Sequence, residues 1–137
     1  MIDIGERADA SISHARKARK AHRCCECFRR IAAGEHYHVE KILFDGRWDT
    51  FRTCSQCRVA QLWLAENCGG YVFECAREEM LEHAREYRPL AFGLYRVAVG
   101  MRRGWRRFGR DEIMSPPKMP GSIASVVEPR AALGRHA

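Results

Sequence analysis

Two pairs of cysteines constrain this chain more than any other feature of its sequence. Cys24 and Cys27 form one Cys-x-x-Cys pair, Cys54 and Cys57 form another, and 26 residues lie between them. Each pair can turn both sulfurs toward one ion at about 2.3 Å, and four thiolates complete a tetrahedral shell. The interval is longer than the usual stretch of about 15–20 residues, which an ordered insert explains. The sequence therefore predicts one structural Zn²⁺ bound by these four cysteines.

The insert between the pairs has the pattern of a β-hairpin. β-branched and aromatic residues are frequent on both sides of Asp45-Gly46. Asp-Gly suits the two-residue type I′ turn because both central residues of that turn need φ > 0. A turn at this place pairs Phe44 with Arg47 and sets the faces of both strands, since side chains alternate along a strand. We expect the core on the face with Tyr37, Val39, Leu43 and Trp48, and the open face to carry His36, His38, Glu40 and Ile42.

A helix is predicted directly after the second cysteine pair. Residues Ser55–Asn67 place Val59, Leu62 and Trp63 at spacings that put them on one buried face. The run Cys68-Gly69-Gly70 ends this helix, because glycine readily takes the left-handed conformation found at helix C-termini. The second cysteine pair therefore lies at the start of a helix.

A zinc knuckle, a β-hairpin and a second knuckle at the start of a helix follow one another from Cys24 to about Asn67. In ligand spacing, in the lead-in Ile31-x-x-Gly34-Glu35-x-Tyr37 and in the helix start, this part of the chain resembles the treble-clef zinc finger family. The resemblance implies that fold and a bound zinc. It does not imply one function, because treble clefs occur in nucleases, in nucleic-acid readers and in protein-binding modules. The short, basic chain also resembles small phage- or prophage-encoded zinc proteins.

Two further helices are predicted after the zinc-binding part. The first spans Tyr71–Tyr87 and has an acidic outer face. The second spans Leu90–Arg110 and carries an apolar stripe that includes Trp105 and Phe108. The side opposite the stripe carries Arg96, Arg102, Arg103, Arg106, Arg107 and Arg110. Residues 111–137 contain several prolines and no periodic apolar face, which predicts a disordered tail.

Together these patterns predict a small α+β zinc-binding domain with an extension on either side. We divide the chain into a basic N-terminal arm (1–23), a zinc-binding module (24–70), a helical extension (71–110) and the tail (111–137). The arm, predicted to be a short helix or flexible, holds six Lys and Arg against three Asp and Glu. Residues 24–95 hold nine against eleven, and residues 96–137 hold nine against three, so the positive charge lies on the flanks. Such flanks favour anionic partners, and the cations of the arm best placed for them are Arg16, Lys17, Arg19 and Lys20.

Three cysteines remain outside the predicted zinc site. Cys25 is an alternative to Cys24 as a ligand, but the two-residue spacer favours Cys24. Cys68 and Cys75 are predicted to be small buried residues. No apolar stretch near Met1 resembles a signal peptide, and no run is long enough to span a membrane. We therefore expect a reducing, cytoplasmic setting, in which thiols stay free.

Three functions are compatible with these features. The leading hypothesis is a non-enzymatic module that contacts nucleic acid largely through phosphates, because arginine forks match phosphate oxygens. The alternative is a protein-interaction module with an acidic partner, or, for a phage-encoded protein, an inhibitor of a nucleic-acid-handling or host defence complex. The third is an HNH-type nuclease in which His36 or His38 would act. The predicted helix Ser55–Asn67 offers no histidine for a catalytic metal and only Asn67 at its end, so we expect no catalytic residue. We also expect no small-molecule substrate.

Overall fold

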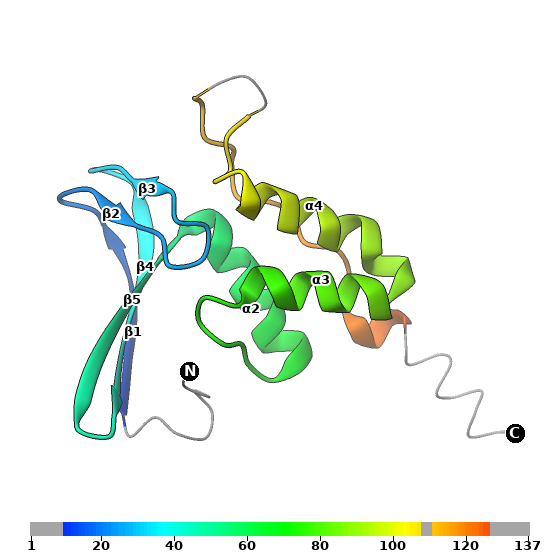
Figure 1. Ribbon diagram of the computed structural model, residues 1–137, viewed down its shortest axis with the longest axis horizontal. Helices are drawn as coiled ribbons and strands as arrows, with labels where there is room; N and C mark the ends of the chain where they lie inside the picture. Colours follow the sequence, from blue (N-terminus) through cyan, green and yellow to red (C-terminus); the bar gives the residue numbers. More distant parts are fainter. Residues whose placement is uncertain (1–9, 108–110, 127–137) are drawn as a thin grey trace, which may run out of the picture.

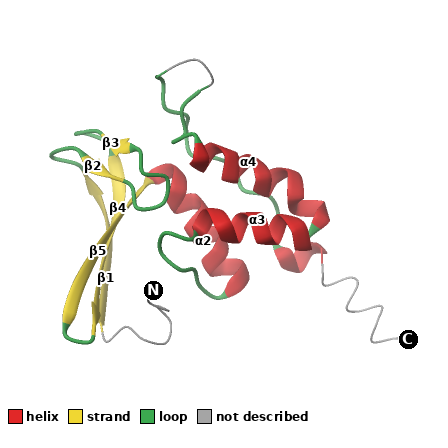
Figure 2. Ribbon diagram, viewed as in Figure 1, coloured by secondary structure: helices red, strands yellow, loops and turns green. Residues whose placement is uncertain are grey.

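A three-stranded antiparallel sheet and three main helices form the part of the chain that this computed structural model describes, residues 10–107 and 111–126 (Figure 1). The sheet has the strand order β1-β4-β5, and a second, two-stranded ribbon pairs β2 with β3. The strands are β1 (Ala10–Lys17), β2 (His22–Arg23), β3 (Arg30–Ile31), β4 (His36–Phe44) and β5 (Arg47–Cys54). The helical elements are α2 (Ser55–Cys68), α3 (Ala76–Glu86), the 3₁₀ turn η1 (Arg88–Leu90) and α4 (Ala91–Arg102). Helix α2 leads away from the sheet, and α3 and α4 pack together beyond it (Figure 2), which confirms the α+β class.

Residues Ala10–Lys17 form strand β1, whereas the sequence predicted a short helix or a flexible arm. Ala10 pairs with Leu43 and Lys17 with His36, so β1 runs antiparallel along almost all of β4. The backbone groups on this edge of β4 need hydrogen-bond partners, and β1 supplies them. The prediction is therefore wrong for residues 10–17, because local composition does not reveal pairing with a strand that comes later in the chain. The part of the arm before Ala10 lies outside the described residues.

The β4–β5 hairpin has the predicted turn and register. Asp45 (φ 52°) and Gly46 (φ 76°) both take positive φ, as the two central residues of a type I′ turn do. Phe44 pairs with Arg47 across the turn. Two residues of local sequence therefore decide the register of the whole hairpin.

The two faces of the hairpin are buried differently from the prediction. Val39 is buried as expected, but Trp48 is 51% exposed, whereas Ile42, predicted on the open face, is fully buried. On that second face Phe51 stacks on Phe73 from the loop before α3, with ring centroids 4.1 Å apart. The core-face prediction is thus wrong in part. Both faces of the strands carry apolar residues, so the pattern alone does not decide which side the helices cover.

Helix α2 agrees with the predicted helix to within one residue, and its buried face is only partly the predicted one. Trp63 is buried as predicted. Cys54 is the N-cap, and its sulfur accepts a hydrogen bond from the Cys57 N–H. Ala60 and Leu64, which follow Cys57 at helical spacing, are buried, whereas Leu62 is exposed. The buried face is therefore the one that contains the metal ligand, since residues three, four and seven positions apart share one side of a helix.

Replacing Gly69 with alanine should lower the free energy of unfolding by about 1 kcal/mol. Gly69 is the C-cap of α2 with φ 76°, and an added Cβ would meet nothing within 4 Å, so the cost comes from the backbone alone. Gly70→Ala is the matched control: its Cβ also meets nothing within 4 Å, and its φ is not positive. Urea unfolding followed by circular dichroism measures both variants. Equal effects at the two positions would contradict the prediction.

The two C-terminal helices are shorter than predicted. Helix α3 begins at Ala76, and Glu74 just before it takes a positive φ of 70°. Helix α4 ends at Arg102, because Gly104 and Trp105 take φ values of 63° and 61° and an α-helix requires φ near −63°. The prediction of a helix to Arg110 is therefore wrong for residues 103–107, and residues 108–110 lie outside the described part of the chain.

The six arginines of the predicted helix consequently do not share one helical face. Arg96 and Arg102 lie in α4 and are exposed. The next three arginines follow the end of α4 and are not helical; they are Arg103, Arg106 and Arg107. Arg110 lies outside the described residues.

Residues 111–126, predicted as part of a disordered tail, contact the helices instead. The side chain of Gln56 in α2 donates to the carbonyl of Met114 (2.7 Å), and the indole N–H of Trp63 donates to the carbonyl of Gly121 (3.3 Å). The prediction of disorder is wrong for this stretch, because α2 supplies polar partners that the tail sequence does not show. The rest of the tail lies outside the described residues.

Candidate metal centre

The four predicted ligands meet at the end of the sheet where α2 begins. The sulfurs of Cys24, Cys27, Cys54 and Cys57 all lie within 4.8 Å of one another, and the Cys27 and Cys54 sulfurs are 3.9 Å apart. Four sulfurs at about 2.3 Å from a tetrahedral ion stand about 3.8 Å apart, so this arrangement fits zinc. Three of the four cysteines are buried and Cys27 is half-buried. The cysteines form a single structural zinc site, because four protein ligands leave no position open for substrate.

Backbone N–H groups point at the sulfurs from both cysteine pairs. The N–H groups of Glu26 and Cys54 each lie 3.4 Å from the Cys24 sulfur, and the Cys57 N–H lies 3.4 Å from the Cys54 sulfur. Hydrogen bonds from Cys27 and the other two cysteines lower the pKa of Cys24 far below its usual range. Donors of this kind stabilise thiolates and fix the orientation of the ligands.

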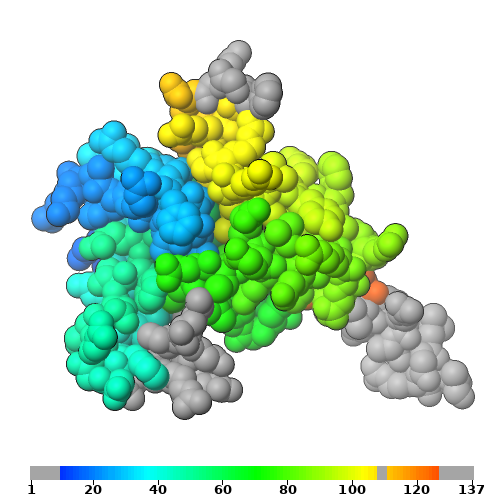
Figure 3. All heavy atoms as spheres, in the orientation of Figure 1, coloured from blue at the N-terminus to red at the C-terminus, as the bar shows by residue number. Residues whose placement is uncertain are grey.

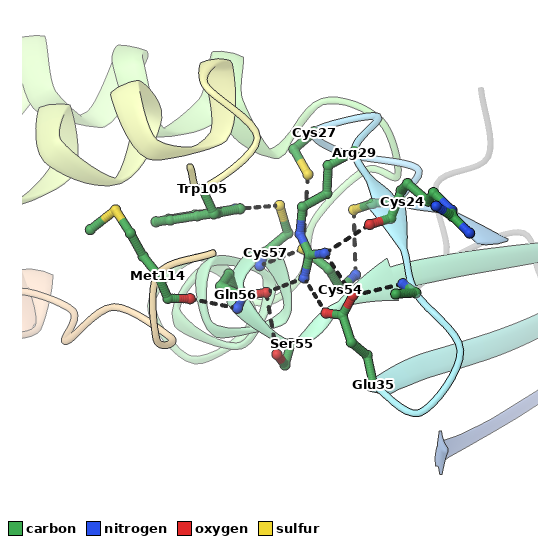
Figure 4. A network of polar contacts seen from close by, with 12 residues as sticks. Cys24, Cys27, Arg29, Glu35, Cys54, Ser55, Gln56, Cys57, Trp105 and Met114 are labelled. Carbon is green, nitrogen blue, oxygen red and sulfur yellow. Dashed lines mark hydrogen bonds and ion pairs between the residues drawn. The ribbon is translucent and has the colours of Figure 1, made fainter. Parts of the chain in front are cut away.

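Trp105 adds a side-chain donor to the centre from a distant part of the chain. Its indole N–H donates to the Cys57 sulfur at 3.2 Å, and the ring is 2% exposed (Figure 4). The sequence pattern places Trp105 only in an apolar stripe, and this role was missed. A signal was present, because a buried tryptophan needs a partner for its N–H.

A buried arginine offsets the negative charge of the centre. Four thiolates and one Zn²⁺ carry two net negative charges, and Arg29 lies beside them with its guanidinium almost fully buried. Arg29 donates to Glu35 (2.8 Å) and to Gln56 (2.7 Å) (Figure 4). Burial alone would lower the pKa of Arg29, but Glu35 and the charge of Cys54 raise it above its usual value, so it stays a cation. Burial likewise opposes ionisation of Glu35, and the bonds from Arg29 still hold the pKa of Glu35 below its usual value.

Glu26, inside the first Cys-x-x-Cys pair, joins the centre to α3. Its carboxylate accepts the N–H groups of Glu74 and Ala76 at 3.2 Å each, so it caps the first turn of α3. Gln61 of α2 donates to the same carboxylate at 2.8 Å. Burial raises the pKa of Glu26, and these hydrogen bonds oppose the rise. The first knuckle, α2 and α3 are therefore linked through one buried side chain.

The remaining cysteines lie outside the sulfur cluster. The Cys25 sulfur is 3.4 Å from the Thr53 hydroxyl, so the structure selects Cys24 rather than Cys25 as the ligand. Cys75 is half-buried. Cys68 is exposed and its sulfur lies 3.1 Å from the His83 ring, which makes the prediction of a buried residue wrong.

The two hairpin histidines lie on the face of β4 that is turned away from the Tyr37 side. His36 is exposed. The Nε2 atom of His38 lies 2.9 Å from the Ser13 hydroxyl and 3.6 Å from the Glu40 carboxylate. Neither histidine belongs to the cysteine cluster.

Four cations of the N-terminal arm gather around one pocket of about 820 Å³, between the end of β1 and β2. The cationic side chains that line it are Arg16, Lys17, Arg19, Lys20 and, from β5, Arg52. The sequence did not reveal Arg52 as a member of this group, because only the sheet places it beside the arm. In Figure 3 this region is the blue part at the edge of the molecule, while the arginines at the end of α4 lie in the yellow part. The structure thus separates the predicted binding residues into two groups.

No family model, no curated protein and no solved structure matches this chain. Within residues 10–107 and 111–126, no helix has the length and apolar character needed to cross a membrane. The function proposed below therefore depends on the geometry and charge of the chain itself.

Proposed function

We propose that the protein is a non-enzymatic, zinc-stabilised module that contacts nucleic acid largely through phosphates. The observation that carries this proposal is the pocket beside β1, where five cationic side chains gather and none of the described lining residues is acidic. Like charges held close together repel one another, and an anionic ligand relieves that repulsion. Phosphate oxygens suit both cation types, since lysine offers a point charge and arginine a planar fork.

The zinc centre supports this pocket directly. Strand β2 runs from the pocket into Cys24, and the N–H of Cys25 donates to the carbonyl of Arg52 at 2.8 Å. We infer that the knuckle, hairpin and helix form a treble-clef-like scaffold whose metal holds the pocket in shape. Zinc binding requires reduced cysteines at positions 24, 27, 54 and 57, so we place the protein in a reducing, cytoplasmic setting.

The arginines at the end of α4 provide a second basic region. Gly104 lies against the Arg29 side chain, so this region adjoins the zinc centre. Arg102 and Arg106 are exposed. Arg107 lies 3.7 Å from Glu112, but both side chains are more than half exposed, and such pairs are weak enough to exchange for a phosphate. We propose that this region adds contacts to the same nucleic acid.

Glutamine at the four arm cations should weaken binding to any duplex and reduce its dependence on salt. The variant is Arg16→Gln, Lys17→Gln, Arg19→Gln and Lys20→Gln, and all four side chains are exposed, so the fold should be spared. Removing one phosphate interaction lowers the slope of log affinity against log salt by about 0.9, so the slope should fall by up to about 3.6. Fluorescence anisotropy with labelled DNA across a salt series measures it.

A charge-matched control separates local contacts from net charge. Glutamine at four exposed cations away from the pocket removes the same charge, the positions being Arg47, Arg85, Arg88 and Lys118. For this control, the slope of log affinity against log salt should stay close to that of the parent protein. If both variants lose affinity equally, or if the parent protein binds no nucleic acid, the proposed function is wrong.

A protein-interaction module is the second candidate, and one observation favours it. Phe92, Tyr95 and Val99 are exposed on one side of α4, with Phe92 77% exposed. The Arg96 guanidinium lies 5.9 Å from the Phe92 ring centre, so the face joins apolar and cationic groups. An acidic protein that binds the parent and the four-glutamine variant equally, with a shallow salt dependence, would favour this function over the first.

A further inference from the structure

The basic pocket contains aromatic groups as well as cations. His22 and Tyr37 line it, with ring centroids 5.2 Å apart and a tilt of 34° between the rings. Tyr37 is buried, whereas His22 is only half-buried. The pocket therefore offers a ring surface beside its charges, which a site for bare phosphate does not need.

Strand pairing fixes where the cations stand relative to these rings. Arg16 of β1 pairs with Tyr37 of β4, and Arg52 of β5 pairs with Val39, so both arginines project on the same face of the sheet as Tyr37. This face is opposite to the one on which Phe51 stacks against the loop before α3. The pocket thus has arginines from both edge strands on the same face of the sheet as the Tyr37 ring.

Arg52 contributes a buried donor to the pocket. Its Nε atom is buried and has no hydrogen-bond partner among the described residues, although the side chain lines the pocket. A buried N–H without a partner is costly, so such groups usually have a function or a ligand. An anionic oxygen in the pocket would satisfy this donor.

We propose that this pocket binds one nucleotide unit of single-stranded nucleic acid, with the base against His22 and its phosphate between Arg16 and Arg52. The inference rests on the proposed function and specifies its ligand. The volume of about 820 Å³ falls in the range of about 300–1,000 Å³ usual for small organic ligands. A base in a duplex is stacked between its neighbours, whereas a base in a single strand is free to stack on a protein ring.

Abasic strands test the base contact without changing the charge. The full-length, zinc-loaded protein is titrated into a fluorescein-labelled single-stranded oligodeoxynucleotide and into a strand of equal length made of abasic sugar phosphates. The parent should bind the normal strand about tenfold more tightly, since stacking one base contributes that much. His22→Ala should abolish this preference while its affinity for the abasic strand stays unchanged. His22→Phe, which keeps a ring, should restore it.

The control is His36→Ala, which removes an exposed histidine that does not line the pocket and should keep the parental preference. If the parent binds both strands equally, the base contact is refuted while phosphate binding stands. If it binds neither strand, the inference fails, and the duplex titration above decides the proposed function. If a folded His22→Ala variant still prefers the normal strand as the parent does, the inference is also wrong. If that variant does not fold, the ratio of the parent's affinities for the two strands decides the test.

Discussion

Serine in place of Cys54 will abolish zinc binding and unfold the protein at room temperature. Structural zinc contributes about 10–16 kcal/mol of apparent binding free energy in zinc-finger peptides, and a small domain has only about 5–15 kcal/mol of total stability. Cys54 is the N-cap of α2, and serine is a good N-cap residue, so the substitution removes the ligand and keeps the cap. Metal analysis and circular dichroism measure the two effects. Cys57→Ser should behave in the same way.

The unfolding should spread beyond the hairpin, because side chains around the sulfurs form hydrogen bonds with the helical part of the protein. Glu26 caps α3, and Trp105, beyond α4, donates to Cys57. Helical signal should therefore fall together with the strand signal in one transition. A variant that keeps the parental spectrum and melting curve without zinc would show that the site is not structural.

Two neighbouring cysteines serve as controls for this experiment. Cys25 adjoins the ligand Cys24 but contacts Thr53 instead of the cluster, and Cys68 is exposed on α2. Cys25→Ser and Cys68→Ser should each retain one zinc per chain. Zinc loss in Cys25→Ser with retention in Cys24→Ser would reverse the ligand assignment.

Alanine at Trp105 should lower the free energy of unfolding by about 3–5 kcal/mol, the usual cost of truncating a buried tryptophan. The ring is 2% exposed, packs against Gly100 and bonds the Cys57 sulfur. Urea unfolding of the zinc-loaded protein, followed by circular dichroism, measures the change. Trp105→Phe keeps most of the packing and removes only the N–H, so its cost should be smaller, about 1.5–3 kcal/mol for a bond to a charged sulfur.

Trp48→Ala is the matched control, because Trp48 is half exposed at the hairpin end. It should cost no more than about 1 kcal/mol, as surface substitutions do. Similar destabilisation at the two tryptophans would contradict the role given to Trp105. Equal stability of Trp105→Phe and the parent would show that the N–H contributes nothing.

Local sequence was enough to predict the metal ligands, the hairpin turn and α2. Cys24 and Cys27, like the second pair, lie three positions apart, so each pair converges within one turn of backbone. Asp45-Gly46 imposes its turn through the φ values of two adjacent residues. These features depend on interactions between near neighbours, and a single sequence records such interactions directly.

The parts that could not be predicted depend on partners far along the chain. Strand β1 forms because β4 offers an edge, and residues 111–126 are placed because Gln56 and Trp63 bond to them. The prediction of one arginine face was wrong because a distant contact ends the helix. The backbone turns at Gly104 and brings Trp105 to the zinc centre. The apolar periodicity favours a continued helix, but the glycines weaken it and tertiary packing outweighs it.

The amino-acid sequence alone determined that four cysteines bind one zinc around a hairpin and a helix, because ligand spacing and turn chemistry act over a few residues. Only the tertiary structure decided what surrounds that centre. It placed Arg29 and Trp105 beside the sulfurs, and it brought Arg52 to the cations of the arm. The physical reason is that charge compensation, burial and pocket formation depend on distances in space, which sequence separation does not give.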